Sequence, residues 1–212
     1  MELRMELGFS GFASAPSGPP KKGGCKSIRP GDCWRRPFAV SGWPTMQGMS
    51  KTLTHRTSPP AEFEEEFITG LKAIFEEKIA FNKLLGLKIT SLKADRVTAR
   101  IDMRAELVGH YAHHRVHGGV ISAGLDSMGA LAVMAALGAR HMEEAPKQRL
   151  HRFGKLGTID LRVDYLRPGI SEWFELRAEV LRLGSRVAST RMELLGADGT
   201  LFSTAAAAYI VS

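Results

Sequence analysis

The sequence predicts an α+β protein in which an antiparallel sheet wraps around a central apolar helix. Residues 118–139 carry a single charge, Asp126, and apolar or small side chains surround the whole segment, so a helix there must be buried. Residues 87–103 alternate between apolar and polar side chains, as a half-buried hairpin does. Further alternating runs follow residue 156. Two packed layers result if these strands cover the helix.

The first 58 residues differ in composition from the rest of the chain. They hold nine Lys or Arg against three acids, a net charge of +6, and six of the ten prolines. We predict a disordered basic extension over 1–58 and one folded domain over 59–212. A start at Met46 or Met49 is an alternative interpretation of this extension. A secretory or mitochondrial leader is disfavoured, because the N-terminus has early acids and no apolar core.

The charge and the cysteines of the chain are concentrated in this extension. The whole chain has a net charge of +7, so residues 59–212 carry only +1, and we expect no nucleic-acid binding by the domain. Cys25 and Cys33 both precede the domain, which therefore has neither a disulfide framework nor a thiol nucleophile. This usage fits a reducing compartment, and we expect a cytoplasmic protein.

Periodicity within the domain predicts the order of its elements. Apolar residues recur at helical spacing over 62–81, which predicts an amphipathic helix of about five turns. The 87–103 hairpin turns near Lys93–Arg96, and a charged loop is expected over 140–155. A long antiparallel meander then follows, with strands at 157–166, 172–183, 186–195 and 200–211.

A membrane span is the alternative interpretation of residues 118–139, because 18 or more apolar residues are long enough to cross a bilayer. The segment is rich in Gly and Ala rather than in Leu and Ile. Asp126 would also cost about 2.5–3.5 kcal/mol in lipid. We therefore expect a buried core helix and no membrane span.

Three motifs resemble one known family. His117-Gly118-Gly119, with Asp126 nine positions after the histidine, resembles the PaaI-type hotdog thioesterases, and so does the strand from Thr158 to Pro168. Gly184-Ser185-Arg186, between two strands, is similar as well. The resemblance covers about 60–211 and is strongest to the branch acting on medium- or long-chain acyl-CoA. It implies a hotdog fold that hydrolyses acyl-CoA to free acid and CoA.

The resemblance also implies a role for each site residue. The Gly118 N–H polarises the thioester carbonyl, Asp126 is the general base or nucleophile, and Thr158 supports the attacking water. We assign substrate binding to Gly119, His110, Tyr111, Gly184, Ser185 and Arg186, with Arg186 a candidate for the CoA phosphates. Many relatives carry Asn six or seven residues before the histidine, where this chain has Tyr111 and His110. The residue that usually positions the attacking group or the substrate is therefore replaced in this chain.

The spacing of the two principal residues predicts an oligomer. Gly118 and Asp126 are eight residues apart, which is about 12 Å along one helix. Both cannot easily reach one thioester carbon from the same chain, whereas an antiparallel partner helix would bring them together. We therefore expect a homodimer or homotetramer whose active sites are shared across a two-fold interface.

Several alternatives stay open for individual residues. Asp126 pairs with an Arg in one interpretation. We count His117 among the catalytic residues, as a positioning residue in preference to a general base, and the alternative is that it only caps the helix. A metal site at His110, His113, His114 and His117 is disfavoured, because zinc needs three or four converging ligands, and we expect no metal and no other cofactor. The basic residues at 149, 152 and 155 either bind CoA phosphates or form a solvated loop.

Two other functions compete with thioester hydrolysis. A hotdog-fold hydratase or dehydratase shares the predicted architecture, but the spacing from His117-Gly118-Gly119 to Asp126 favours hydrolysis. A non-catalytic acyl-CoA-binding module needs no carboxylate in the helix, so Asp126 argues against it.

Overall fold

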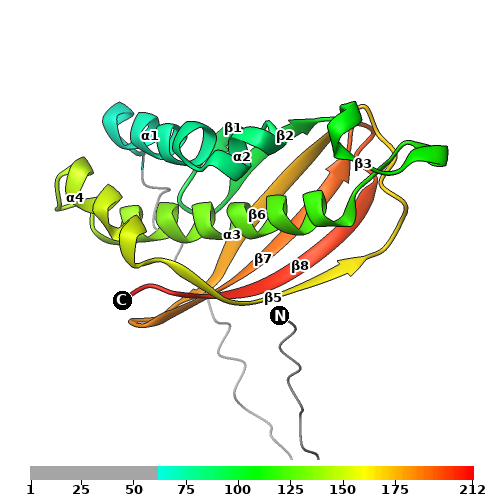
Figure 1. Cartoon of the computed structure of the whole chain (residues 1–212). Coiled ribbons are helices and arrows are strands. Elements are labelled where there is room, and N and C mark those ends of the chain that lie inside the picture. The colour runs from blue at the N-terminus through cyan, green and yellow to red at the C-terminus, as the bar shows by residue number, and fades with distance from the viewer. Residues whose placement is uncertain (1–61) are drawn as a thin grey trace, which may run out of the picture. The chain divides into compact units, whose positions relative to one another are not determined.

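A computed structural model describes residues 62–212, and in it an antiparallel sheet curls around the long helix α3 (Figure 1). The predicted α+β hotdog architecture is confirmed. The extension predicted over 1–58 lies outside the described residues.

The helices have the following bounds: α1 Glu65–Lys72, the π-helical segment η2 Ala73–Lys78, α2 Ala80–Leu85, α3 Gly118–Arg140 and α4 Pro146–His151, with 3-10 turns η3 Ala105–Leu107, η4 Tyr111–His113 and η5 Arg152–Lys155. The strands are β1 Lys88–Leu92, β2 Val97–Asp102, β3 Val108–His110, β4 Arg115–Val116, β5 Gly157–Tyr165, β6 Trp173–Leu183, β7 Val187–Gly196 and β8 Leu201–Ile210.

The main sheet has the strand order β1-β2-β6-β7-β8-β5, with every neighbouring pair antiparallel. The predicted hairpin is confirmed as β1 and β2, and β6, β7 and β8 form a meander. The prediction of one four-stranded meander is wrong for β5, which pairs with β8 at the far edge of the sheet. The chain therefore crosses the sheet between β5 and β6, a long-range arrangement that local periodicity does not encode.

Small residues let α3 lie close against the sheet. An added Cβ at Gly124 would approach a methyl group of Leu176 on β6 to 2.8 Å, so α3 lies close to the sheet at this position. Leu125, Met128 and Leu131 are completely buried. Of the described helices, α3 alone is long and apolar enough to cross a membrane, but most of that stretch is enclosed by the fold, which supports the core interpretation.

The predicted continuous helix over 62–81 is interrupted. After α1 the chain continues as the π-helical η2 and breaks at Ile79, whose backbone is extended, before α2 begins. The break redirects α2 toward α3. There the side-chain amide oxygen of the buried Asn82 accepts a hydrogen bond from the Ser127 hydroxyl of α3, 2.7 Å away. Local apolar periodicity does not predict this polar contact, because the contact joins two helices that are far apart in the sequence.

The predicted charged loop over 140–155 instead contains α4 followed by η5. Pro146 occupies the first turn of α4, a position that favours proline. Arg149 in this helix is completely buried, and its guanidinium contacts the Glu64 carboxylate, the Gly138 carbonyl oxygen at 3.3 Å and the ring of Phe67 at 4.6 Å. Arg149 thus joins α4 to α1 and α3, and it is not available to CoA phosphates.

Replacing this buried arginine should destabilise the domain. Arg149→Met leaves the Gly138 carbonyl oxygen without its guanidinium donor, a loss that typically costs about 1–3 kcal/mol. The exposed neighbour Lys147 provides a control, because Lys147→Met should change the free energy of unfolding by less than about 0.5 kcal/mol. Urea denaturation measures both variants, and equal stabilities would contradict the role given to Arg149.

The ion pair between Arg149 and Glu64 also makes the free energy of unfolding depend on pH. The hydrogen bond from Arg149 holds the pKa of Glu64 below its ordinary value of 4.5. The resulting stabilisation is therefore present above about pH 4.5 and is lost as pH falls through the lowered pKa. Arg149→Met should remove this part of the acid dependence, so the stability gap between the two proteins narrows in acid.

Candidate active site

The first turn of α3 presents a backbone N–H that nothing in the fold uses. His117 is the N-cap residue, and its Nδ1 accepts a hydrogen bond from the Gly119 N–H at 2.9 Å. The N–H groups of Val120 and Ile121 bond to the His117 carbonyl oxygen. Within residues 62–212 the Gly118 N–H has no hydrogen-bond partner. It is therefore free to bind a carbonyl oxygen at the positive end of the helix dipole.

A groove of about 370 Å³ opens beside Gly118. Tyr165, at the end of β5, donates a hydrogen bond from its hydroxyl to the Gly118 carbonyl oxygen at 3.0 Å. The position of Tyr165 next to Gly118 was not predicted, because only the strand containing it gave a sequence signal. The groove is lined by Arg115, Val116, Gly118, Ile121, Tyr165, Leu166, Arg167, Pro168 and Gly169.

The β3–β4 hairpin lies at the same end of α3. Gly109 approaches His117 so closely that an added Cβ would lie 2.5 Å from the His117 Cα. His110 follows directly, and its ring stacks on those of Tyr111 at 6.0 Å and His113 at 4.9 Å. His110 and Tyr111 are thus near Gly118 and open to solvent.

Asp126, two turns further along α3, is held by two hydroxyl groups. Its Oδ1 lies 3.0 Å from the Thr158 hydroxyl and 3.0 Å from the Tyr209 hydroxyl. The Tyr209 hydroxyl is also 2.8 Å from the Asp126 carbonyl oxygen. No Lys or Arg among residues 62–212 forms an ion pair with Asp126, so this part of the chain does not supply the arginine partner of the alternative interpretation.

Tyr209 was not predicted as a site residue. It is completely buried, and burial, followed by the Asp126 charge, raises its pKa well above the usual range. The hydroxyl therefore stays protonated and can donate. The one sequence signal was a large aromatic residue after four alanines in a strand, Ala205 to Ala208.

Comparison with known proteins identifies the family. The family model for the thioesterase superfamily matches residues 113–203. The Medium/long-chain acyl-CoA thioesterase YigI of Escherichia coli K12 is 33% identical over 147 residues, covering 69% of this chain and 95% of that protein. The chain belongs to the thioesterase superfamily. Salmonella typhimurium YigI is 34% identical with the same coverage. A Shewanella oneidensis structure related to the thioesterase superfamily is 36% identical, with a TM-score of 0.65, covering 71% of this chain and 100% of that one.

The candidate residues of this thioesterase fall into three places along α3. Gly118, Gly119, His110 and Tyr111 lie at its N-terminal end, and Thr158 meets Asp126 further along. Gly184, Ser185 and Arg186 form the β6–β7 turn. Arg140, at the end of α3, donates to the Gly184 carbonyl oxygen at 3.1 Å, which places that turn at the C-terminal end of the helix. One chain does not bring the three groups together.

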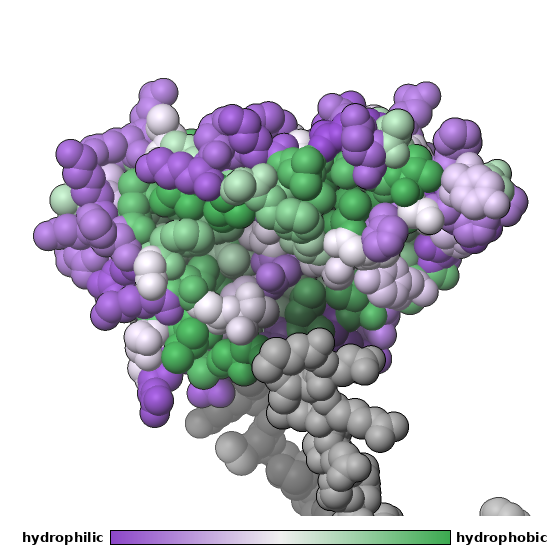
Figure 2. All heavy atoms as spheres, viewed as in Figure 1, coloured by the Kyte–Doolittle hydropathy of each residue, from purple (hydrophilic) through white to green (hydrophobic). Residues whose placement is uncertain are grey.

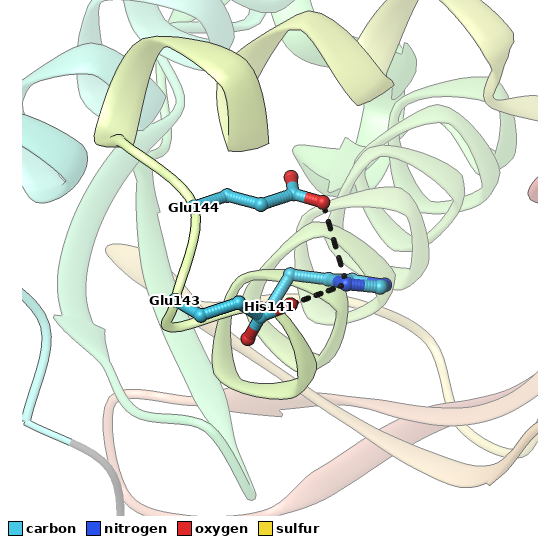
Figure 3. A group of neighbouring side chains, drawn as sticks. All are labelled: His141, Glu143 and Glu144. Carbon is cyan, nitrogen blue, oxygen red and sulfur yellow. Dashed lines mark hydrogen bonds and ion pairs between the residues drawn. The ribbon is translucent and has the colours of Figure 1, made fainter.

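A possible metal-binding group lies just beyond α3 in the thioesterase. His141, Glu143 and Glu144 converge there (Figure 3), with His141 Nδ1 3.3 Å from Glu143 and 3.5 Å from Glu144. Arg152 contacts both carboxylate oxygens of Glu144 and lowers the pKa of Glu144. A cation already balances this group, so it is a structural ion-pair network. Arg152 is accordingly engaged and is a poor candidate for CoA phosphates.

His117 should act as a helix cap and not as a general base. Asn is a strong N-cap residue, so His117→Asn should keep kcat within about tenfold, whereas His117→Ala loses the cap at a cost of about 0.5–2 kcal/mol. Thermal unfolding and thioester hydrolysis measure the two effects. Loss of about 10²–10⁴-fold in kcat for both variants would instead indicate a general base.

Proposed function

We propose that this thioesterase hydrolyses medium- or long-chain acyl-CoA to free acid and CoA. The observation that carries the proposal is the combination of an unused N–H at Gly118 with a carboxylate, Asp126, held by two hydroxyl donors. These are the oxyanion donor and the water-activating group that thioester hydrolysis needs. The identity to YigI, whose name specifies medium- and long-chain acyl-CoA, supports the substrate class.

The reaction follows from these two groups. The thioester carbonyl oxygen accepts a hydrogen bond from the Gly118 N–H, which stabilises the negative charge that develops on it. Asp126 takes a proton from a water molecule, and the oxygen of that water attacks the carbonyl carbon. Collapse of the tetrahedral intermediate breaks the C–S bond, and the CoA thiolate leaves and takes up the proton that the Asp126 carboxyl group holds. In the alternative route Asp126 attacks directly, and water then hydrolyses the mixed anhydride.

The groove beside Gly118 provides a path for the substrate. Arg115 and Arg167 on its wall are suited to the anionic phosphates of CoA. Val116, Ile121 and Leu166 supply apolar surface along the same groove. We place His110, Tyr111 and Gly119 at the entrance, because the β3–β4 hairpin and the first turn of α3 border it.

We propose that each active site is shared between two chains in a homodimer or homotetramer. About 12 Å of helix separates Gly118 from Asp126, so an antiparallel partner α3 is needed to bring one of each together. The same pairing of helices brings the partner's Gly184-Ser185-Arg186 turn toward the groove that we propose for CoA. The free edge strand β5 supports an interface, because Ile159 is 56% exposed and Leu166, just after it, is 50% exposed. Apolar residues also gather across the α3 face (Figure 2).

A thiol-release assay tests the reaction. Wild-type protein should release CoA faster from decanoyl- and palmitoyl-CoA than from acetyl-CoA, and Asp126→Asn should lower kcat by about 10²–10⁴-fold. Asp95→Asn, at an exposed acid in the turn between β1 and β2, should leave kcat unchanged. Acyl-CoA binding with no thiol release would favour the non-catalytic module. Water addition to an enoyl-CoA would favour the hydratase.

Mixing two inactive variants tests the shared site. Asp126→Ala removes the carboxylate, and Gly118→Val hinders approach to the oxyanion donor. An equal mixture, after subunit exchange, should recover up to about a quarter of wild-type activity, because half of the dimers are mixed and half of their sites are intact. Native mass spectrometry verifies the exchange. No recovery after proven exchange would mean that each site is built within one chain.

A further inference from the structure

We propose that Tyr209 is a positioning residue for Asp126: together with Thr158 it fixes Oδ1 and leaves Oδ2 as the oxygen that acts on water or substrate. This inference rests on the proposed function. It adds a residue from the last strand to the surroundings of the Asp126 carboxylate, which otherwise come from α3 and β5.

The two donors reach the carboxylate from neighbouring strands. Thr158 of β5 and Tyr209 of β8 are directly paired in the sheet, and both hydroxyls lie 3.0 Å from the same oxygen, Asp126 Oδ1. β8 is an interior strand, paired on both sides by β7 and β5. A hydroxyl carried on such a rigid element restricts the carboxylate more closely than one on a loop.

The other carboxylate oxygen remains available. Within residues 62–212, no hydrogen bond or ion pair involves Asp126 Oδ2. The two donors stabilise negative charge on Oδ1, so the lone pairs of Oδ2 are the ones left for a proton or a carbonyl carbon. The arrangement assigns different tasks to the two oxygens of one side chain.

Helix α3 is shaped to admit the Tyr209 hydroxyl. Tyr209 also lies 2.8 Å from the Asp126 carbonyl oxygen, so it contacts the helix backbone and the carboxylate at once. An added Cβ at Gly129, one turn further along, would overlap the tyrosine hydroxyl and lie 2.9 Å from its Cζ. Glycine at 129 and tyrosine at 209 therefore form a matched pair.

Removing only the hydroxyl separates positioning from packing. Tyr209→Phe keeps the buried ring, so the CoA groove is untouched and KM should stay within about twofold. The carboxylate loses one of its two restraints, and kcat should fall by about 10- to 100-fold, the range expected for misplacement of a reacting group. Ser203→Ala is the control, because it removes a buried hydroxyl from the same strand that has no contact with Asp126.

The Gly129 contact gives a second, independent variant. Gly129→Ala retains the tyrosine hydroxyl but displaces it, so it should reproduce the fall in kcat at unchanged KM. Combining Gly129→Ala with Tyr209→Phe relieves the closest overlap, and the double variant should be no slower than Tyr209→Phe alone. A role in packing alone would lower the melting temperature and leave kcat, measured below that temperature, unchanged.

The outcomes distinguish this inference from the function it rests on. If Asp126→Asn is inactive while folded Tyr209→Phe retains full kcat, the positioning role is wrong and the thioesterase assignment stands. If Asp126→Asn retains activity, the assignment of the site itself is wrong. Should Tyr209→Phe fail to fold, Gly129→Ala decides: full kcat in that variant overturns the inference.

Discussion

The burial of α3 is the constraint on which the rest of the structure depends. This helix has apolar or small side chains on all sides, so it must be enclosed, and the sheet curls around it to do so. A carboxylate in such a helix needs polar partners. Among residues 62–212 the fold supplies them as hydroxyl groups from two paired strands, and these hydroxyls orient Asp126.

The sequence predicted what is local and missed what is long-range. Alternation located β5 to β8 to within a residue or two, and the apolar run located α3, because these periods are set by burial of a single element. The place of β5 beside β8 is a pairing between segments about 45 residues apart, which periodicity does not report. The contact of Tyr209 with Asp126 spans 83 residues and left only a weak sequence signal. The sequence left Arg149 open between a CoA-phosphate ligand and a solvated loop residue, yet a carboxylate, a carbonyl oxygen and an aromatic ring enclose it.

Under the proposed function, one helix carries two parts of the chemistry that a single chain keeps apart. The Gly118 N–H lies at the N-terminus of α3 and the Asp126 carboxylate two turns along it, and the geometry of an α-helix fixes this separation. Under the proposed arrangement, association of two chains completes each site. Catalysis and assembly are then linked, so dilution below the dimer dissociation constant removes activity without unfolding the domain.

A crystal structure with a ketone analogue of palmitoyl-CoA, in which a methylene group replaces the thioester sulfur, tests the shared site most directly. The account predicts the analogue's carbonyl oxygen within about 2.7–3.2 Å of the Gly118 nitrogen of one protomer. Its carbonyl carbon should face the Asp126 Oδ2 of the partner subunit. A complex in which Gly118 and Asp126 of the same chain hold the carbonyl group, or in which neither does, would contradict the account.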